Sequence, residues 1–134
     1  MINKESEVAS DLKRVLDEIN SSLGDFNERP AKMATDISAS GDTPLHKIAI
    51  WGDVASAEVL LSNGADINAH GEDQDTPLHR AIAGEHLDMI RFLVANGARA
   101  DLPNRYGTTP LKEAENSGNP SLVAAFRWKF TDST

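Results

Sequence analysis

Four histidines and a run of carboxylates are the residues of this 134-residue chain whose types could do chemistry. Histidine and carboxylate side chains serve as metal ligands and as catalytic acids and bases. The chain has no cysteine, which excludes disulfides, cysteine-based zinc sites and a cysteine nucleophile. Histidines and carboxylates at a suitable spacing are therefore the first candidates for a reactive site.

The histidines do not follow a metal or catalytic pattern. His46 and His79 each end a copy of the same short motif, and each follows its threonine by one helical turn. They occupy equivalent points of neighbouring units, about 10 Å apart, which is too far for one metal ion. We expect each to hydrogen-bond its own threonine turn. His70 is expected to be a loop histidine and His86 a histidine at a helix start.

The carboxylates do not form a recognisable site either. Residues 73–75 (Asp-Gln-Asp) begin like a calcium loop, but Leu78 takes the place of the required glycine and Gly84 that of the closing glutamate. The chain contains no glycine-rich phosphate loop, no G-x-S-x-G and no H-E-x-x-H. We therefore predict no catalytic residue, no metal and no cofactor, and a protein that is not an enzyme.

A 33-residue repeat is the strongest pattern in the chain. Thr-Pro-Leu-His at residues 43–46 recurs at 76–79, and Thr-Pro-Leu recurs at 109–111; Asn-Gly-Ala at 63–65 recurs at 96–98. Threonine caps a helix, proline suits its first position, and glycine ends a helix in the left-handed conformation. Each unit is predicted to be a pair of short helices. Such helices are unstable alone, so the units must stack.

A 33-residue helix pair that opens with Thr-Pro-Leu-His and closes with Gly-Ala resembles the ankyrin repeat. The resemblance covers about residues 39–130 and predicts an array over 41–130, with repeats at about 41–73, 74–106 and 107–130. It implies an all-α solenoid of helix-turn-helix units with short β-hairpin loops. It also implies a binding surface made by the hairpin tips and the concave face of the first helices.

The second and third repeats depart from the pattern. The second has Gly84-Glu85 where the family usually has glycine in second place, and Gln74 where the other repeats have Gly41 and Gly107. We expect its loop to be shaped differently. The third has Lys112 in place of histidine and a bulky second helix, which we interpret as the C-terminal cap.

Residues 1–40 do not fit the repeat. Apolar residues from Val8 to Leu23 fall at helical spacing and predict an amphipathic helix over about 5–23. We favour the interpretation that this helix caps the exposed core of the first repeat. The alternative is that it binds a partner or a second copy of the chain. The rest is predicted as a linker over 25–40, with a short helix near 31–37, and a C-terminal tail over 131–134.

The charge favours a protein partner with a basic surface. The chain carries −8, and residues 41–75 hold seven acids against one base. Such acidity disfavours nucleic acid and anionic membranes. The resemblance implies contacts before each threonine and on the outward side of the first helices: Asp42, Lys47, Ile50, Trp51, Glu72, Asp73, Asp75, Arg80, Arg105, Tyr106, Thr108, Lys112 and Asn116.

Within this set Trp51 and Tyr106 are the expected anchors, since aromatic residues are enriched among interface hot spots. Partial burial of Trp51 against a neighbouring repeat is equally open, and the acids could be only a solvated rim. Because the prediction consists of a repeat array and one helix, we expect that binding a partner is itself the function of the protein. This favours a small intracellular inhibitor or immunity-type antitoxin; the alternative is an adaptor or scaffold that assembles through its N-terminal helix.

The first ten residues are polar, and no stretch approaches 18 apolar residues. We therefore expect a cytoplasmic protein, and a monomer rather than a homo-oligomer.

Overall fold

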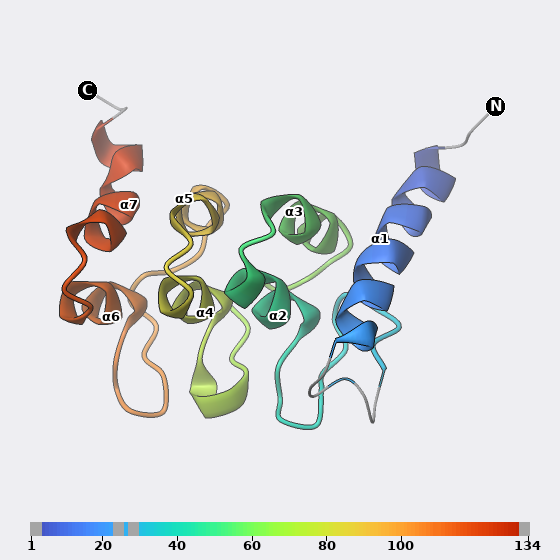
Figure 1. The fold of residues 1–134 in the computed structure, drawn as a ribbon, viewed down its shortest axis with the longest axis horizontal. Helices are drawn as coiled ribbons and strands as arrows, with labels where there is room; N and C mark the ends of the chain where they lie inside the picture. The colour runs from blue at the N-terminus through green and yellow to red at the C-terminus, as the bar shows by residue number, and fades with distance from the viewer. Residues whose placement is uncertain (1–3, 23–25, 27–29, 132–134) are drawn as a thin grey trace.

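The computed structural model describes residues 4–22, 26 and 30–131. In these residues seven α-helices and one short 3₁₀ turn follow one another (Figure 1). Their bounds are α1 Lys4–Ser21, α2 Pro44–Trp51, α3 Val54–Ser62, η1 Glu72–Gln74, α4 Pro77–Ala83, α5 Leu87–Ala95, α6 Pro110–Asn116 and α7 Pro120–Thr131.

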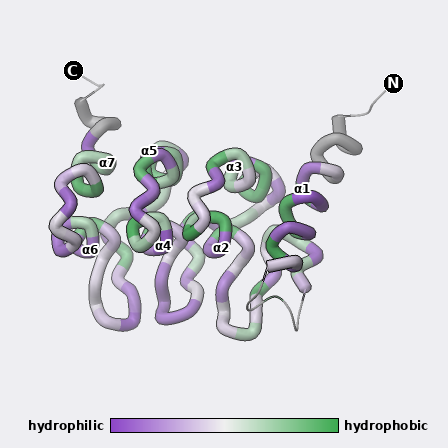
Figure 2. The backbone as a smooth tube through the Cα atoms, viewed as in Figure 1, coloured by the Kyte–Doolittle hydropathy of each residue, from purple (hydrophilic) through white to green (hydrophobic). Residues whose placement is uncertain are grey.

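The helices after α1 stack as pairs, and this confirms the predicted all-α solenoid. Helices α2, α4 and α6 form one row, α3, α5 and α7 form a second, and three extended loops project together from one side (Figure 1). Helix α1 lies at the N-terminal end against α2 and α3. Hydrophobic residues concentrate on the helices, while the loops are largely hydrophilic (Figure 2).

Threonine begins the first helix of every repeat, as the Thr-Pro pattern predicts. The ring Nδ1 of His46 accepts the N–H of Thr43 at 3.1 Å, and that of His79 accepts the N–H of Thr76 at 3.0 Å. This confirms the expected bond between histidine and threonine turn. In the third repeat the hydroxyl of Thr109 still accepts a backbone N–H, at 3.1 Å.

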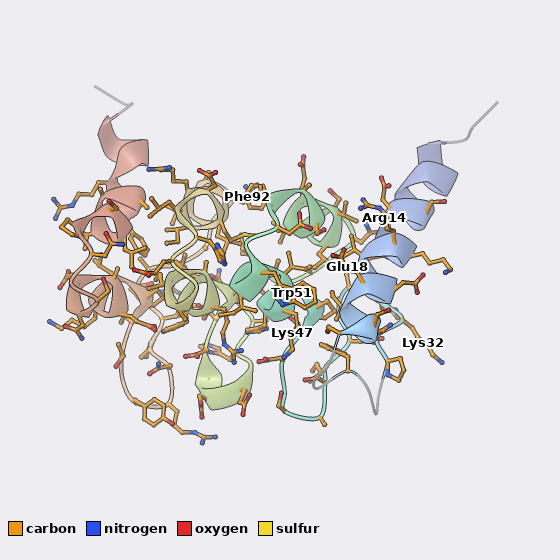
Figure 3. All side chains as sticks on the ribbon, viewed as in Figure 1. Arg14, Glu18, Lys32, Lys47, Trp51 and Phe92 are labelled. Atoms are coloured by element: carbon orange, nitrogen blue, oxygen red, sulfur yellow. The ribbon has the colours of Figure 1, made fainter. Side chains whose placement is uncertain are left out.

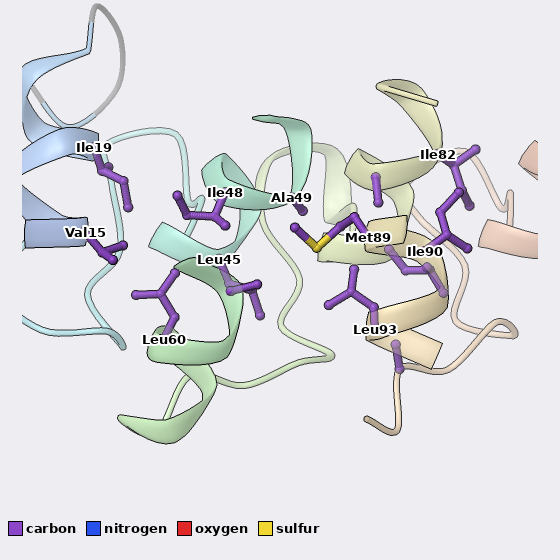
Figure 4. Packing of buried hydrophobic residues seen from close by; sticks show 14 of the residues in the cluster. Val15, Ile19, Leu45, Ile48, Ala49, Leu60, Ile82, Met89, Ile90 and Leu93 are labelled. Carbon is purple, nitrogen blue, oxygen red and sulfur yellow. The ribbon is translucent and has the colours of Figure 1, made fainter. Parts of the chain in front are cut away.

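The core runs continuously through the stack. Its apolar side chains come from both rows of helices and from α1, so no repeat has a core of its own (Figure 4). Removing one such side chain from water stabilises a fold by about 1.5–3 kcal/mol. The largest fully buried apolar residues are Val15, Ile19, Leu45, Ile48, Leu60, Leu78, Met89, Ile90, Leu93 and Leu122.

Helix α1 contributes Val15, Leu16 and Ile19 to this core. The side chain of Asn20 then fixes the returning chain: it donates to the carbonyl of Ala31 at 2.9 Å and accepts the N–H of Ala31 at 2.8 Å. The helix is thereby tied to the segment that leads into the first repeat.

The expected short helix near 31–37 is absent, and residues 33–35 form a turn instead. The carboxylate of Asp36 accepts the N–H of Lys32 at 2.8 Å and that of Met33 at 3.0 Å. An aspartate that binds nearby backbone N–H groups competes with helix formation. The predicted helix is therefore wrong for a local reason.

Candidate partner-binding surface

The three loops share one hydrogen-bonding scheme. The backbone N–H of Ser38, Gly71 and Asn104 donates to the carbonyl four residues later, at 2.8, 2.7 and 3.0 Å. The carbonyl of each of these residues also accepts the N–H of the residue three positions later, at 3.0 Å. One repeat period separates each starting position from the next, so the loops are equivalent turns that lie side by side (Figure 1).

Hydrogen bonds join each loop to the next. The N–H of Glu72 donates to Asp42 Oδ1 at 2.8 Å, and the N–H of Arg105 donates to the carbonyl of Asp73 at 2.7 Å. The amide of Asn104 donates to Asp75 Oδ1 at 3.1 Å. These bonds fix the three tips relative to one another.

His46 and His79 also connect neighbouring repeats. Because Nδ1 accepts a threonine N–H, the proton of the neutral ring lies on Nε2. His46 donates this proton to the carbonyl of Asp75 at 2.8 Å, and His79 donates its proton to the carbonyl of Thr108 at 2.9 Å. Burial lowers the pKa of both rings, which favours this neutral form.

Asp42 and Arg80 form an internal ion pair. The Asp42 side chain is 0% exposed and accepts two bonds from the Arg80 guanidinium, at 3.0 and 3.1 Å. Arg80 also approaches Asp75 Oδ2 at 3.4 Å and donates to the carbonyl of Glu72 at 3.3 Å. A side chain at Gly71 would collide with Asp42 and His46, so glycine is needed there.

The predicted contact set changes accordingly. Asp42 is buried, and Arg80 and Asp75 are largely engaged in the internal network, so these three do not fit a direct contact with a partner. Ile50 and Thr108 are half-buried and contribute their carbonyls to His86 and His79. The sequence did not reveal this because Arg80 and Asp42 are 38 positions apart.

Four predicted residues lie together at the exposed tips of the second and third loops, and we call them the hairpin-tip surface: Glu72, Asp73, Arg105 and Tyr106. Tyr106 is 71% exposed, and its hydroxyl donates to Asp73 Oδ1 at 3.4 Å. Arg105 Nη1 lies 3.3 Å from the same oxygen. The surface thus combines an aromatic ring, a guanidinium and two carboxylates.

The remaining predicted residues lie on the first helices. Trp51, 40% exposed, and Lys47 are four residues apart on α2 and therefore share a face (Figure 3). Lys112 is exposed on α6, where it lies 3.8 Å from Glu115, and Asn116 is exposed at the end of that helix. The structure does not bring these residues into the hairpin-tip cluster.

Three residues of interest escaped the sequence prediction. Met33 and Ile37 are 58% and 55% exposed in the segment before the repeats, where no periodic pattern exists to flag them. Glu113 on α6 is partly buried. A comparison of equivalent positions in successive repeats would have found it, because it occupies the position that Arg80 holds in the second repeat.

Metal sites and membrane-spanning helices are two further features that bear on function. No group of three or more histidine or carboxylate side chains in the described part of the chain could hold a metal ion. None of the helices described is both long and apolar enough to cross a membrane.

A family model of ankyrin repeats, which occur in many copies, matches residues 45–94 and again residues 78–126. The chain belongs to the ankyrin-repeat family. The two matches start one repeat period apart and together cover more than half of the chain. No curated protein matches the chain. As an ankyrin-repeat protein it is a protein–protein interaction module, and this family is typically not enzymatic.

Proposed function

We propose that this ankyrin-repeat protein is a small cytoplasmic inhibitor or immunity-type antitoxin that binds a basic protein through its hairpin tips and concave face. The hairpin-tip surface carries the proposal. Tyr106 offers a large exposed contact area, and the neighbouring loops already hold the tips in place. A preformed surface loses little entropy on binding.

Charge supports a basic partner. The chain carries −8, and Glu72 and Asp73 bring carboxylates to the tips. Acidic groups attract a basic protein and raise its association rate. Arg105 adds a local positive charge, which fits a partner patch that is basic overall but mixed in detail.

The test is an affinity pull-down from native cell extract, followed by an activity assay of the captured protein. Trp51→Ala/Tyr106→Ala removes both exposed aromatic anchors, and Met33→Ala is the matched control because Met33 is exposed outside the proposed surface. We expect the wild type and the control to retain a basic protein and suppress its activity, and the double variant to lose both effects.

Two outcomes would contradict this proposal. Retention by the double variant would place the binding surface elsewhere, and a captured protein with unchanged activity would rule out inhibition. The alternative, an adaptor that self-assembles through α1, predicts a dimer in sedimentation. Burial of Val15, Leu16 and Ile19 within the chain supports the monomer, because these residues are not free to pair two copies.

A further inference from the structure

The charge of one position on the first helices is reversed in the third repeat. Arg80 on α4 binds Asp42 of the preceding loop through both of its terminal nitrogens. One repeat later, the equivalent loop residue is Asp75 and the equivalent helix residue is Glu113. The junction between the second and third repeats therefore places a carboxylate where the preceding junction has a guanidinium.

Glu113 is poorly accommodated in this position. Its Oε2 atom is buried and has no hydrogen-bond partner among the described residues. An unsatisfied buried oxygen destabilises a fold more when it carries charge. The residue is therefore easier to bury as a neutral carboxylic acid than as a carboxylate.

The charged groups around Glu113 do not neutralise it. Asp75 faces it from the second loop and Arg80 faces it from α4, but Arg80 is already bound by Asp42 and Asp75. On α6 itself, Lys112 and Glu115 lie 3.8 Å from each other. On α7, Arg127 is exposed. His79 of α4 donates to the loop carbonyl of Thr108.

We propose that Glu113 makes the junction between the second and third repeats a proton-controlled latch. Protonation removes the buried charge and its repulsion from Asp75, so α6 and α7 are held more firmly. Ionisation restores both unfavourable effects and loosens this helix pair. The mismatch is confined to one junction, so we expect the response to be local.

The direction of the pH effect follows from the environment. Burial is the main cause that raises the pKa of Glu113 above 4.5, Asp75 raises it further, and Arg80 opposes them. The folded state then binds more protons than the unfolded state above pH 4.5. Stability at this junction falls as the pH rises from there through the raised pKa, and the loss is complete at higher pH.

The latch would affect binding because the third loop carries Arg105 and Tyr106. Loosening α6 and α7 would release this half of the hairpin-tip surface from its fixed position. Only this consequence depends on the proposed function. The latch itself can be tested without any partner.

The experiment is amide hydrogen exchange on the full chain at pH 5.0 and 7.5, corrected for the intrinsic exchange rates. It compares the wild type with Glu113→Gln, which keeps the shape and removes the charge. Glu115→Gln is the control, because Glu115 is an exposed glutamate on the same helix. We expect wild type and control to lose protection in α6 and α7 at pH 7.5 relative to Glu113→Gln.

The same pH dependence in Glu113→Gln as in the wild type would overturn the latch. An equal loss of protection across α2 to α5 would also overturn it, because the effect would then be global. His79 contributes an opposite pH response, since burial lowers its pKa, but it is common to all three proteins. The difference between wild type and Glu113→Gln therefore isolates Glu113.

Discussion

Single residues in this protein hold neighbouring repeats together by polar contacts that are mostly buried. Asp42 is the clearest case, because its fully buried carboxylate binds both Arg80 and the N–H of Glu72. Removal of Asp42 leaves the N–H of Glu72 without its acceptor, and it leaves Arg80 with one neighbouring carboxylate, that of Asp75 at 3.4 Å.

We therefore expect Asp42→Ala to lower the free energy of unfolding by about 3–5 kcal/mol. Glu72→Ala is the control, because that side chain is exposed and its loss should cost less than about 0.5 kcal/mol. Urea denaturation followed by circular dichroism measures both values. Similar losses in the two variants would contradict a structural role for Asp42.

His46 gives a second prediction at this scale. Burial is the main cause that lowers its pKa below 6.5, so the unfolded chain binds more protons than the folded chain between the two values. Stability should fall as the pH drops below 6.5, because the protonated ring cannot accept the N–H of Thr43. Burial also lowers the pKa of His79, which acts in the same direction. Urea midpoints at pH 7.5 and 5.5, measured in Glu113→Gln to remove the opposing effect of Glu113, therefore test the two buried histidines together. A higher midpoint at pH 5.5 would exclude it.

At the scale of elements, the second repeat contains left-handed residues that are not glycine. Gln74 has φ of 61° where the other repeats have Gly41 and Gly107, and Glu85 has φ of 55° where they have Gly52 and Gly118. Glycine adopts this conformation without strain, whereas other residues lose roughly 1–2 kcal/mol. The loop of this repeat keeps the hydrogen bonds of the other two loops, so the expected difference in shape is wrong. The second repeat differs instead in backbone strain at two turns.

Gln74→Gly should raise the free energy of unfolding by up to about 1 kcal/mol, because relief of strain exceeds the added entropy of the unfolded chain. Glu85→Gly should gain less, because it also removes a bond of 3.1 Å from Asn119. Thermal unfolding of the two variants beside the wild type provides the comparison. A loss of stability in Gln74→Gly would show that this turn is not strained.

The elements could be predicted from the sequence where the cause is local. Thr-Pro starts and Asn-Gly stops lie within one helix each, and the 33-residue period reveals how the helices stack. The surroundings of Asp42 and Glu113 could not be predicted in the same way, because each side chain faces residues of another repeat. Hence the helices of the repeats agree with the prediction, while the helix near 31–37 and part of the contact set do not.

At the scale of the whole molecule, the core is shared among repeats. Leu78 is fully buried in the central first helix, and replacement by alanine should lower the free energy of unfolding by about 2–5 kcal/mol. Since each repeat depends on its neighbours, the variant should still unfold in a single transition in urea. Two separate transitions would mean that the repeats are independent.

The side-chain bonds that His46 and Arg80 make to neighbouring repeats span 29 and 38 positions, about one unit length. Each unit therefore meets only the units beside it, and no contact depends on the total number of units. A gene that copied one internal unit in frame would present the same surfaces to both neighbours. This architecture can lengthen in single steps during evolution, and each step would add one loop to the binding edge.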